Sequence, residues 1–85
     1  MASKTVKVGS SIGLHARPAT LIAQAATEAG QPVTIGPPGG TPVDAGSALL
    51  IMTLGAKKGD SVEVSGDDEG AVTAIAEMVE QDLDA

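Results

Sequence analysis

The residues with the greatest potential for chemistry lie together in one short stretch, Gly13-Leu14-His15-Ala16-Arg17-Pro18-Ala19. This stretch contains the only histidine of the chain and one of its five basic residues. An unperturbed imidazole is a largely neutral nucleophile near pH 7, and a guanidinium offers a fork of donors that suits phosphate oxygens. Two positions apart, His15 and Arg17 therefore indicate a site for a phosphoryl group that histidine carries.

A helix is predicted directly behind this stretch. An apolar pattern of helical period runs over residues 16–29 and ends at Gly30. The chain would turn at Gly13 and place Pro18 in the first helical turn, where a missing N–H is tolerated. A helix start presents unpaired backbone N–H groups and the positive end of the dipole, which together can hold a phosphate. The competing interpretation is a loop histidine at a helix start, with Arg17 simply solvated.

Composition restricts the classes of function. The chain has 85 residues, 42% of them hydrophobic, which suits one globular domain over residues 1–85. The lack of cysteine and the single histidine argue against a disulfide or a metal site. A net charge of −6 argues against nucleic-acid binding, which needs a basic surface. No stretch suits a signal peptide or a membrane span, so we expect a cytoplasmic protein. We also expect a monomer without a cofactor.

The remaining pattern predicts the layer that must position the site. Apolar alternation and turn residues predict strands over residues 4–8, 31–35, 41–44 and 61–65. A short helix over 49–54 follows Ser47 as N-cap, and a last helix runs from the acidic residues 67–69 towards the chain end. Pro42 cannot donate to a ladder, so the third strand is predicted at a sheet edge. This order predicts an α+β fold, an open two-layer sandwich with helices on one face of an antiparallel sheet.

Inward-facing positions follow from the same periodicity. The predicted core positions of the strands are Val6, Val8, Val33, Ile35, Val62 and Val64. The predicted inward stripe of the first helix is Leu21, Ile22, Ala25, Ala26 and Ala29, and that of the last helix is Val72, Ile75, Ala76, Val79 and Leu83.

Two motifs give the chain a specific resemblance to a known family. The stretch from Gly13 to Ala19 closely resembles the active-site signature of HPr, the histidine-containing phosphocarrier family of the bacterial sugar phosphotransferase system. Residues 44–56, Asp-Ala-Gly-Ser-Ala-Leu-Leu-Ile-Met-Thr-Leu-Gly-Ala, resemble the family's serine-containing helix and the turn after it. The resemblance covers essentially the whole chain. It implies a four-stranded antiparallel sheet of order 1-4-2-3 with three helices on one face.

The resemblance also implies a function. Enzyme I would pass a phosphoryl group from phosphoenolpyruvate to a ring nitrogen of His15, and a sugar-specific Enzyme II A component would then take it. The backbone of Ala16 and Arg17 and the Arg17 guanidinium would hold the phosphate. The protein would be a phosphoryl carrier and not an enzyme, since others regenerate it.

The resemblance further implies a docking surface and a regulatory serine. Partner-binding candidates are Thr20 in the first helix and Ala48, Leu49 and Met52 in the short helix, although some residues of the apolar run 49–52 must be core. Ser47 matches the serine that an HPr kinase phosphorylates in many relatives, although it also suits a plain N-cap.

Two alternatives stay open at this point. One is an HPr-like regulatory module of a nitrogen-type or signalling phosphorelay, which differs from a sugar carrier in the Enzyme I that phosphorylates it. The other is a hydrolase with His15 as base, but no serine or cysteine nucleophile and no acidic pair is placed by motif near the histidine.

Overall fold

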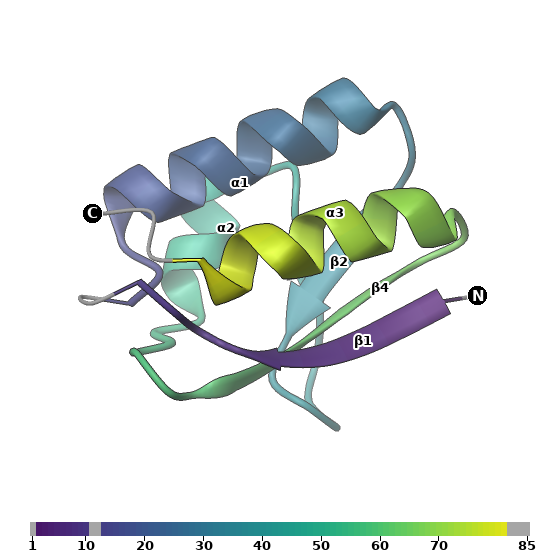
Figure 1. The fold of residues 1–85 in the computed structure, drawn as a ribbon. Coiled ribbons are helices and arrows are strands. Elements are labelled where there is room, and N and C mark those ends of the chain that lie inside the picture. Colours follow the sequence, from purple (N-terminus) through teal and green to yellow (C-terminus); the bar gives the residue numbers. More distant parts are fainter. Residues whose placement is uncertain (1, 11–12, 82–85) are drawn as a thin grey trace.

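The computed structural model describes residues 2–10 and 13–81 (Figure 1). Within them the chain forms β1 (Ala2–Lys7), α1 (Ala16–Ala29), β2 (Val33–Gly36), β3 (Val43–Asp44), α2 (Ala48–Thr53), β4 (Ser61–Gly66) and α3 (Glu69–Glu80). The strands form one antiparallel sheet in the order β1-β4-β2-β3. Figure 1 shows the helices over one face of this sheet. The predicted fold class and strand order are confirmed.

The sheet is built around β4, which pairs with β1 along its whole length and with β2 on its other side. Val64 lies opposite Ile35, and both side chains are completely buried beneath the helices. Val62 and Val33 are buried as well, as the alternation predicted. Val6 is only half-buried because β1 is an edge strand, whereas Val8, one residue beyond the strand, belongs to the core.

The third strand is shorter than predicted. β3 contains only Val43 and Asp44, which pair with Ile35 and Thr34 of β2. It lies at the edge of the sheet, as the adjacent Pro42 led us to expect, but Pro42 itself is outside the ladder. Gly36 packs so closely there that a Cβ on it would lie 2.7 Å from the Pro42 Cα.

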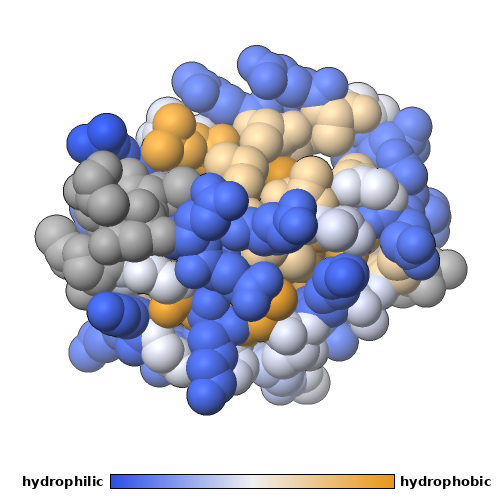
Figure 2. Space-filling view, viewed as in Figure 1, coloured by the Kyte–Doolittle hydropathy of each residue, from blue (hydrophilic) through white to orange (hydrophobic). Residues whose placement is uncertain are grey.

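The buried stripe of α1 differs from the predicted one. Ile22 and Ala26 are buried as predicted, but Leu21 and Ala25 are half-buried and Ala29 is exposed. The other buried residues of α1 are Pro18, Ala19 and Ala23, so the buried stripe is rotated by about one position from the predicted one. Figure 2 shows apolar surface along the line between α1 and α3, bordered by hydrophilic side chains.

The C-terminal end of the last helix, α3, packs against the loop after β1. In α3, Val72, Ile75, Ala76 and Val79 are buried as predicted, while predicted Leu83 lies outside the described residues. The Val79 carbonyl accepts a 2.9 Å hydrogen bond from the N–H of Gly9. A Cβ on Gly9 would overlap the Glu80 carbonyl, so the loop towards α1 rests directly on the C-terminal end of α3.

Candidate functional site

The loop before α1 is held in place by its backbone. Leu14 is buried, and its N–H donates a 2.9 Å hydrogen bond to the Ala56 carbonyl in the segment between α2 and β4. Gly13 has a φ of +89°, which only glycine adopts readily. A Cβ there would overlap the Ala56 carbonyl oxygen and lie 2.8 Å from the Lys57 Cα. A buried leucine and an obligatory glycine therefore fix the position of the next residue, His15.

His15 is the N-cap residue of α1 and is partly exposed. Its carbonyl starts the helix by accepting a 2.9 Å bond from the N–H of Ala19, but its side chain makes no capping hydrogen bond. A capping side chain usually accepts from the second or third helical N–H, and the third residue here is Pro18, which has no N–H. The imidazole is thus not used to cap the helix.

Two backbone donors remain at the start of α1. The N–H groups of Ala16 and Arg17 have no acceptor among the residues that the structure describes, and both residues are exposed. They are the first two helical positions, where N–H groups point out of the helix. Together with the positive end of a 14-residue helix dipole, they can accept an anion beside His15.

The charges near the helix starts distinguish α1 from α3. The N-cap residue of α3 is Asp68, whose carboxylate accepts the Gly70 N–H at 3.2 Å, and Glu69 lies in the first turn of that helix. The first turn of α1 contains no acidic residue. The positive end of the α3 dipole is therefore met by carboxylates of its own first residues, whereas the first turn of α1 contributes none.

Arg17 adds a full positive charge to the same turn. Its side chain is exposed and makes no ion pair with any described residue. An unpaired guanidinium can turn towards a phosphate without breaking an existing contact. The structure thus brings three of the predicted site residues, His15, Ala16 and Arg17, to one solvent-facing helix start.

The short helix α2 divides its apolar run between core and surface. Ile51 is completely buried, whereas Leu49, Leu50 and Met52 are 69%, 38% and 36% exposed. In the described part of the chain, these three are the only large hydrophobic side chains that are exposed. The two predicted docking residues with large apolar side chains, Leu49 and Met52, therefore both lie at the surface. Leu50 was not among the predicted docking residues. Its exposure could have been expected because one helix face cannot bury four consecutive residues.

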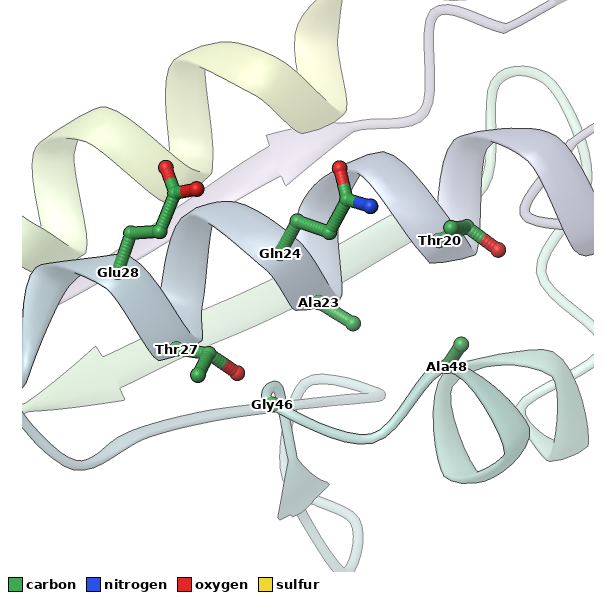
Figure 3. A pocket seen from close by; sticks show the side chains of 7 residues that line it. All are labelled: Thr20, Ala23, Gln24, Thr27, Glu28, Gly46 and Ala48. Carbon is green, nitrogen blue, oxygen red and sulfur yellow. The ribbon is translucent and has the colours of Figure 1, made fainter.

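Thr20 and Ala48 face each other across a groove of about 460 Å³ between α1 and the start of α2 (Figure 3). Thr20 is exposed and Ala48 is half-buried. The groove is also lined by Ala23, Gln24, Thr27, Glu28 and Gly46. Gly46 contributes no side chain to it. The groove could not be predicted from the sequence because it depends on how the two helices pack.

Ser47 caps α2, as predicted. Its Oγ accepts a hydrogen bond of 3.3 Å from the N–H of Leu50, and its side chain is half-buried. Ser47 therefore lies at the base of the exposed apolar helix and next to the groove.

Over residues 2–10 and 13–81, no group of three or more His, Cys, Asp or Glu side chains is arranged to hold a metal ion. In that same part of the chain, no helix is long and apolar enough to cross a membrane.

Comparisons with known proteins identify close relatives. Residues 2–81 match the family model described as the PTS HPr component phosphorylation site. The chain is 45% identical over 78 residues to the phosphocarrier protein HPr of Streptomyces coelicolor, covering 92% of this chain and 84% of that protein. Two solved structures are similar. HPr-C-His from Thermoanaerobacter tengcongensis has a TM-score of 0.87 at 30% identity, covering 100% and 98% of the two chains. A phosphocarrier protein HPr from Bacillus anthracis has a TM-score of 0.81 at 34% identity, covering 92% and 95%.

Proposed function

The chain belongs to the HPr family of phosphocarrier proteins of the phosphotransferase system, and we propose that His15 is the residue on which it carries the phosphoryl group. Phosphorylated Enzyme I donates the group to His15, and a sugar-specific Enzyme II A component accepts it. We assign this cycle to the cytoplasm, the compartment that holds phosphoenolpyruvate. The observation that carries the proposal is the start of α1, where a partly exposed imidazole lies beside two N–H groups that have no acceptor among the described residues, in a first turn without an acidic residue.

Each transfer exchanges one bond to phosphorus for another. The lone pair of an imidazole nitrogen of His15 forms a P–N bond while the bond from phosphorus to the donor atom of Enzyme I breaks. The second transfer repeats this with His15 as the leaving group and an Enzyme II A nucleophile as the acceptor. The N–H groups of Ala16 and Arg17 and the guanidinium stabilise the charge on the phosphoryl oxygens in both directions, and no cofactor is required.

We further propose that both partners dock on α2 and the adjoining side of α1. Leu49 and Met52 provide exposed apolar surface there, and Leu50 extends it. Thr20 and Ala48 continue this surface along the groove in Figure 3. Exposed apolar side chains gathered on one short helix suit a protein interface better than solvent. They also provide contact area without enclosing the phosphoryl group, which leaves His15 accessible to two different partners.

Ser47 is proposed as a regulatory phosphorylation site for an HPr kinase. Its hydroxyl is half-buried and its position at the start of α2 would put the new charge beside the docking surface. A phosphate there would weaken the apolar contacts that a partner makes with α2. The test is incubation of the protein with an HPr kinase and ATP, followed by intact mass measurement, with Ser47→Ala as the control that must not gain mass.

The central proposal is tested with phosphoenolpyruvate and a purified Enzyme I of a sugar pathway. We expect one added phosphoryl group by intact mass, lost on acid treatment because a P–N bond is acid-labile. His15→Ala should gain no mass, and it should keep the fold because the bond that starts α1 uses the backbone carbonyl of residue 15, which alanine retains. Retained labelling of this variant would show that the phosphoryl group is not on His15.

Arg17→Ala separates phosphate stabilisation from folding. Because Arg17 is exposed and has no ion pair with a described residue, its removal should leave the urea midpoint unchanged and slow transfer by about tenfold or more. An unfolded variant would mean that Arg17 is structural. If the unmodified protein gained no mass at all, the regulatory-module alternative with a different phosphoryl donor would be favoured.

A further inference from the structure

The loop between β1 and α1 provides hydrogen-bond donors for the C-terminal end of α3. The last carbonyl groups of an α-helix have no partner within the helix, so other donors must satisfy them. The N–H of Gly9 donates to the Val79 carbonyl at 2.9 Å. The Ser10 hydroxyl donates a longer bond of 3.4 Å to the carbonyl of Gln81, the C-cap residue of α3. The helix thus ends against two residues of the loop that leads to His15.

The contact between this loop and α3 is close. A Cβ on Gly9 would overlap the Glu80 carbonyl oxygen, so no larger residue fits without a shift of backbone atoms. The φ of Gly9 is not positive, so a glycine is needed here for space and not for its conformational freedom. The next residue, Ser10, is completely buried, and in the described part of the chain it is the only buried residue with a polar or charged side chain. Buried polar side chains are normally hydrogen-bonded and so help to fix the local geometry.

Backbone hydrogen bonds continue from Ser10 to His15. The Ser10 carbonyl accepts the Gly13 N–H at 2.9 Å, and the Gly13 carbonyl accepts the His15 N–H at 3.0 Å. With the bond from the Ser10 hydroxyl to Gln81, three hydrogen bonds in series therefore join the end of α3 to the backbone of His15. Figure 1 shows the C-terminal end of α3 and the start of α1 at the same end of the molecule.

A phosphoryl acceptor must be placed accurately. The attacking nitrogen has to lie in line with the bond that breaks, and a displacement of about 1 Å can slow a reaction about a hundredfold. The His15 imidazole moves with the backbone to which it is attached. We propose that Gly9 and Ser10 are positioning residues, through which the end of α3 sets the place of the His15 imidazole relative to the start of α1. This inference rests on the proposed function, since the position of His15 affects the transfer rate only if His15 accepts the phosphoryl group.

Gly9→Ala is the first test, and Gly66→Ala is its matched control. Gly66 also has no positive φ, and a Cβ on it would likewise come too close to a backbone carbonyl oxygen, 2.6 Å from that of Pro32. Gly66 ends β4 opposite Ala2, whereas the loop leaves β1 at the other end of this strand pair. The two variants thus introduce the same type of overlap, but only Gly9→Ala introduces it next to the loop that carries His15.

The assay measures phosphoryl transfer from phosphorylated Enzyme I as a function of carrier concentration, under conditions in which circular dichroism shows each variant to be folded. We expect both variants to have lower urea midpoints than the unmodified chain, because each overlap must be relieved by a shift. Gly9→Ala should lower the maximal rate by about tenfold or more and change the KM for the carrier by less than about twofold, because the apolar residues of α2 are unchanged. Gly66→Ala should change neither quantity by more than about twofold.

Ser10→Ala is the second test, because it removes the hydroxyl without introducing an overlap. Its control is Thr34→Val, which removes a hydroxyl that donates to the Ser65 carbonyl at the same distance of 3.4 Å, between β2 and β4. We expect Ser10→Ala to slow transfer by about two- to fivefold and to shift the backbone amide signals of Gly13 and His15 in NMR spectra. Thr34→Val should leave the rate and both signals unchanged.

The amide signals distinguish positioning from stability. A side chain that only stabilises the fold would lower the urea midpoint without moving the His15 signal of the folded protein. Normal transfer by a folded Gly9→Ala or by Ser10→Ala would overturn the positioning role of that residue, and slowing of equal size in Gly66→Ala would overturn it as well. If Gly9→Ala did not fold, unmoved amide signals and normal transfer in Ser10→Ala would overturn the inference.

The unmodified chain separates this inference from the proposed function. If it accepted no phosphoryl group, the proposed function itself would fail and the inference with it. If it accepted one phosphoryl group and the variants transferred normally, only the inference would fail.

Discussion

Gly13→Ala tests whether the backbone of one glycine sets the geometry of the His15 site. Gly13 combines a φ of +89° with a close approach to the segment after α2. A methyl group there would overlap the Ala56 carbonyl oxygen and come within 2.8 Å of the Lys57 Cα. Both neighbours are backbone atoms, so they cannot move aside as a flexible side chain would. The loop must shift, and with it the hydrogen bond from the Leu14 N–H to Ala56.

The expected loss of stability follows from three contributions. An alanine forced to positive φ costs about 1–2 kcal/mol, and the lost hydrogen bond about 0.5–1.5 kcal/mol. Residual overlap adds to these, so we expect a decrease in the free energy of unfolding of roughly 2–4 kcal/mol. A domain typically has about 5–15 kcal/mol, so the variant should stay folded in buffer. Phosphoryl transfer should nevertheless slow by about tenfold or more, because His15 is displaced by the same shift.

Gly30→Ala is the matched control. Gly30 also has a positive φ, +69°, but a Cβ on it would meet no atom within 4 Å. It lies at the other end of α1, so this variant should lose only about 1 kcal/mol from backbone strain and transfer at the normal rate. Urea unfolding followed by circular dichroism suits a chain without aromatic residues. If Gly13→Ala were no less stable than Gly30→Ala and transferred normally, the close approach would not position His15.

Two further predictions concern α2. Ile51→Ala removes a completely buried side chain and should lower the free energy of unfolding in urea by about 2–5 kcal/mol. Leu49→Ala, at a side chain that is 69% exposed, should change it by no more than about 0.5 kcal/mol and should instead weaken Enzyme I binding in titration calorimetry. Equal stability losses would contradict the division of the helix into core and surface. Ser47→Ala should lose about 1 kcal/mol in the same unfolding assay because the cap on the Leu50 N–H is removed, and an unchanged midpoint would show that the 3.3 Å bond contributes nothing.

The sequence predicted the bounds of the helices better than it predicted which of their side chains are buried. The bounds of α1 agree with the prediction because Pro18 and Gly30 mark its two ends in an unambiguous way. Its buried stripe was wrong because small apolar residues occur on several faces: Ala25 and Ala29 look as suitable for a core as Ala19 and Ala23. Which alanines are buried is decided by the neighbours of the helix, and local periodicity contains no information about them.

The candidate site likewise has a part that the sequence predicts and a part that it does not. His15, Ala16 and Arg17 are consecutive or nearly so, and a helix start at residue 16 was enough to bring them together. The approach of Gly13 to Lys57 joins residues more than forty positions apart in the chain. It depends on the packing of two loops at the end of the sheet. Sequence spacing alone could therefore place the residues of the proposed phosphoryl site together, but it could not predict that the segment at Lys57 lies beside them.

In the cycle we propose, the position of Pro18 would let one helix start serve both for binding and for release. A phosphocarrier must hold a phosphoryl dianion and then lose it, so a site with every helical donor aimed at the phosphate would be too favourable. Pro18 removes the third N–H of α1, and the N–H of Ala19 is already bonded to the His15 carbonyl. Two backbone donors remain. In the proposed cycle, one buried proline therefore limits the number of backbone donors that hold the phosphoryl group on His15.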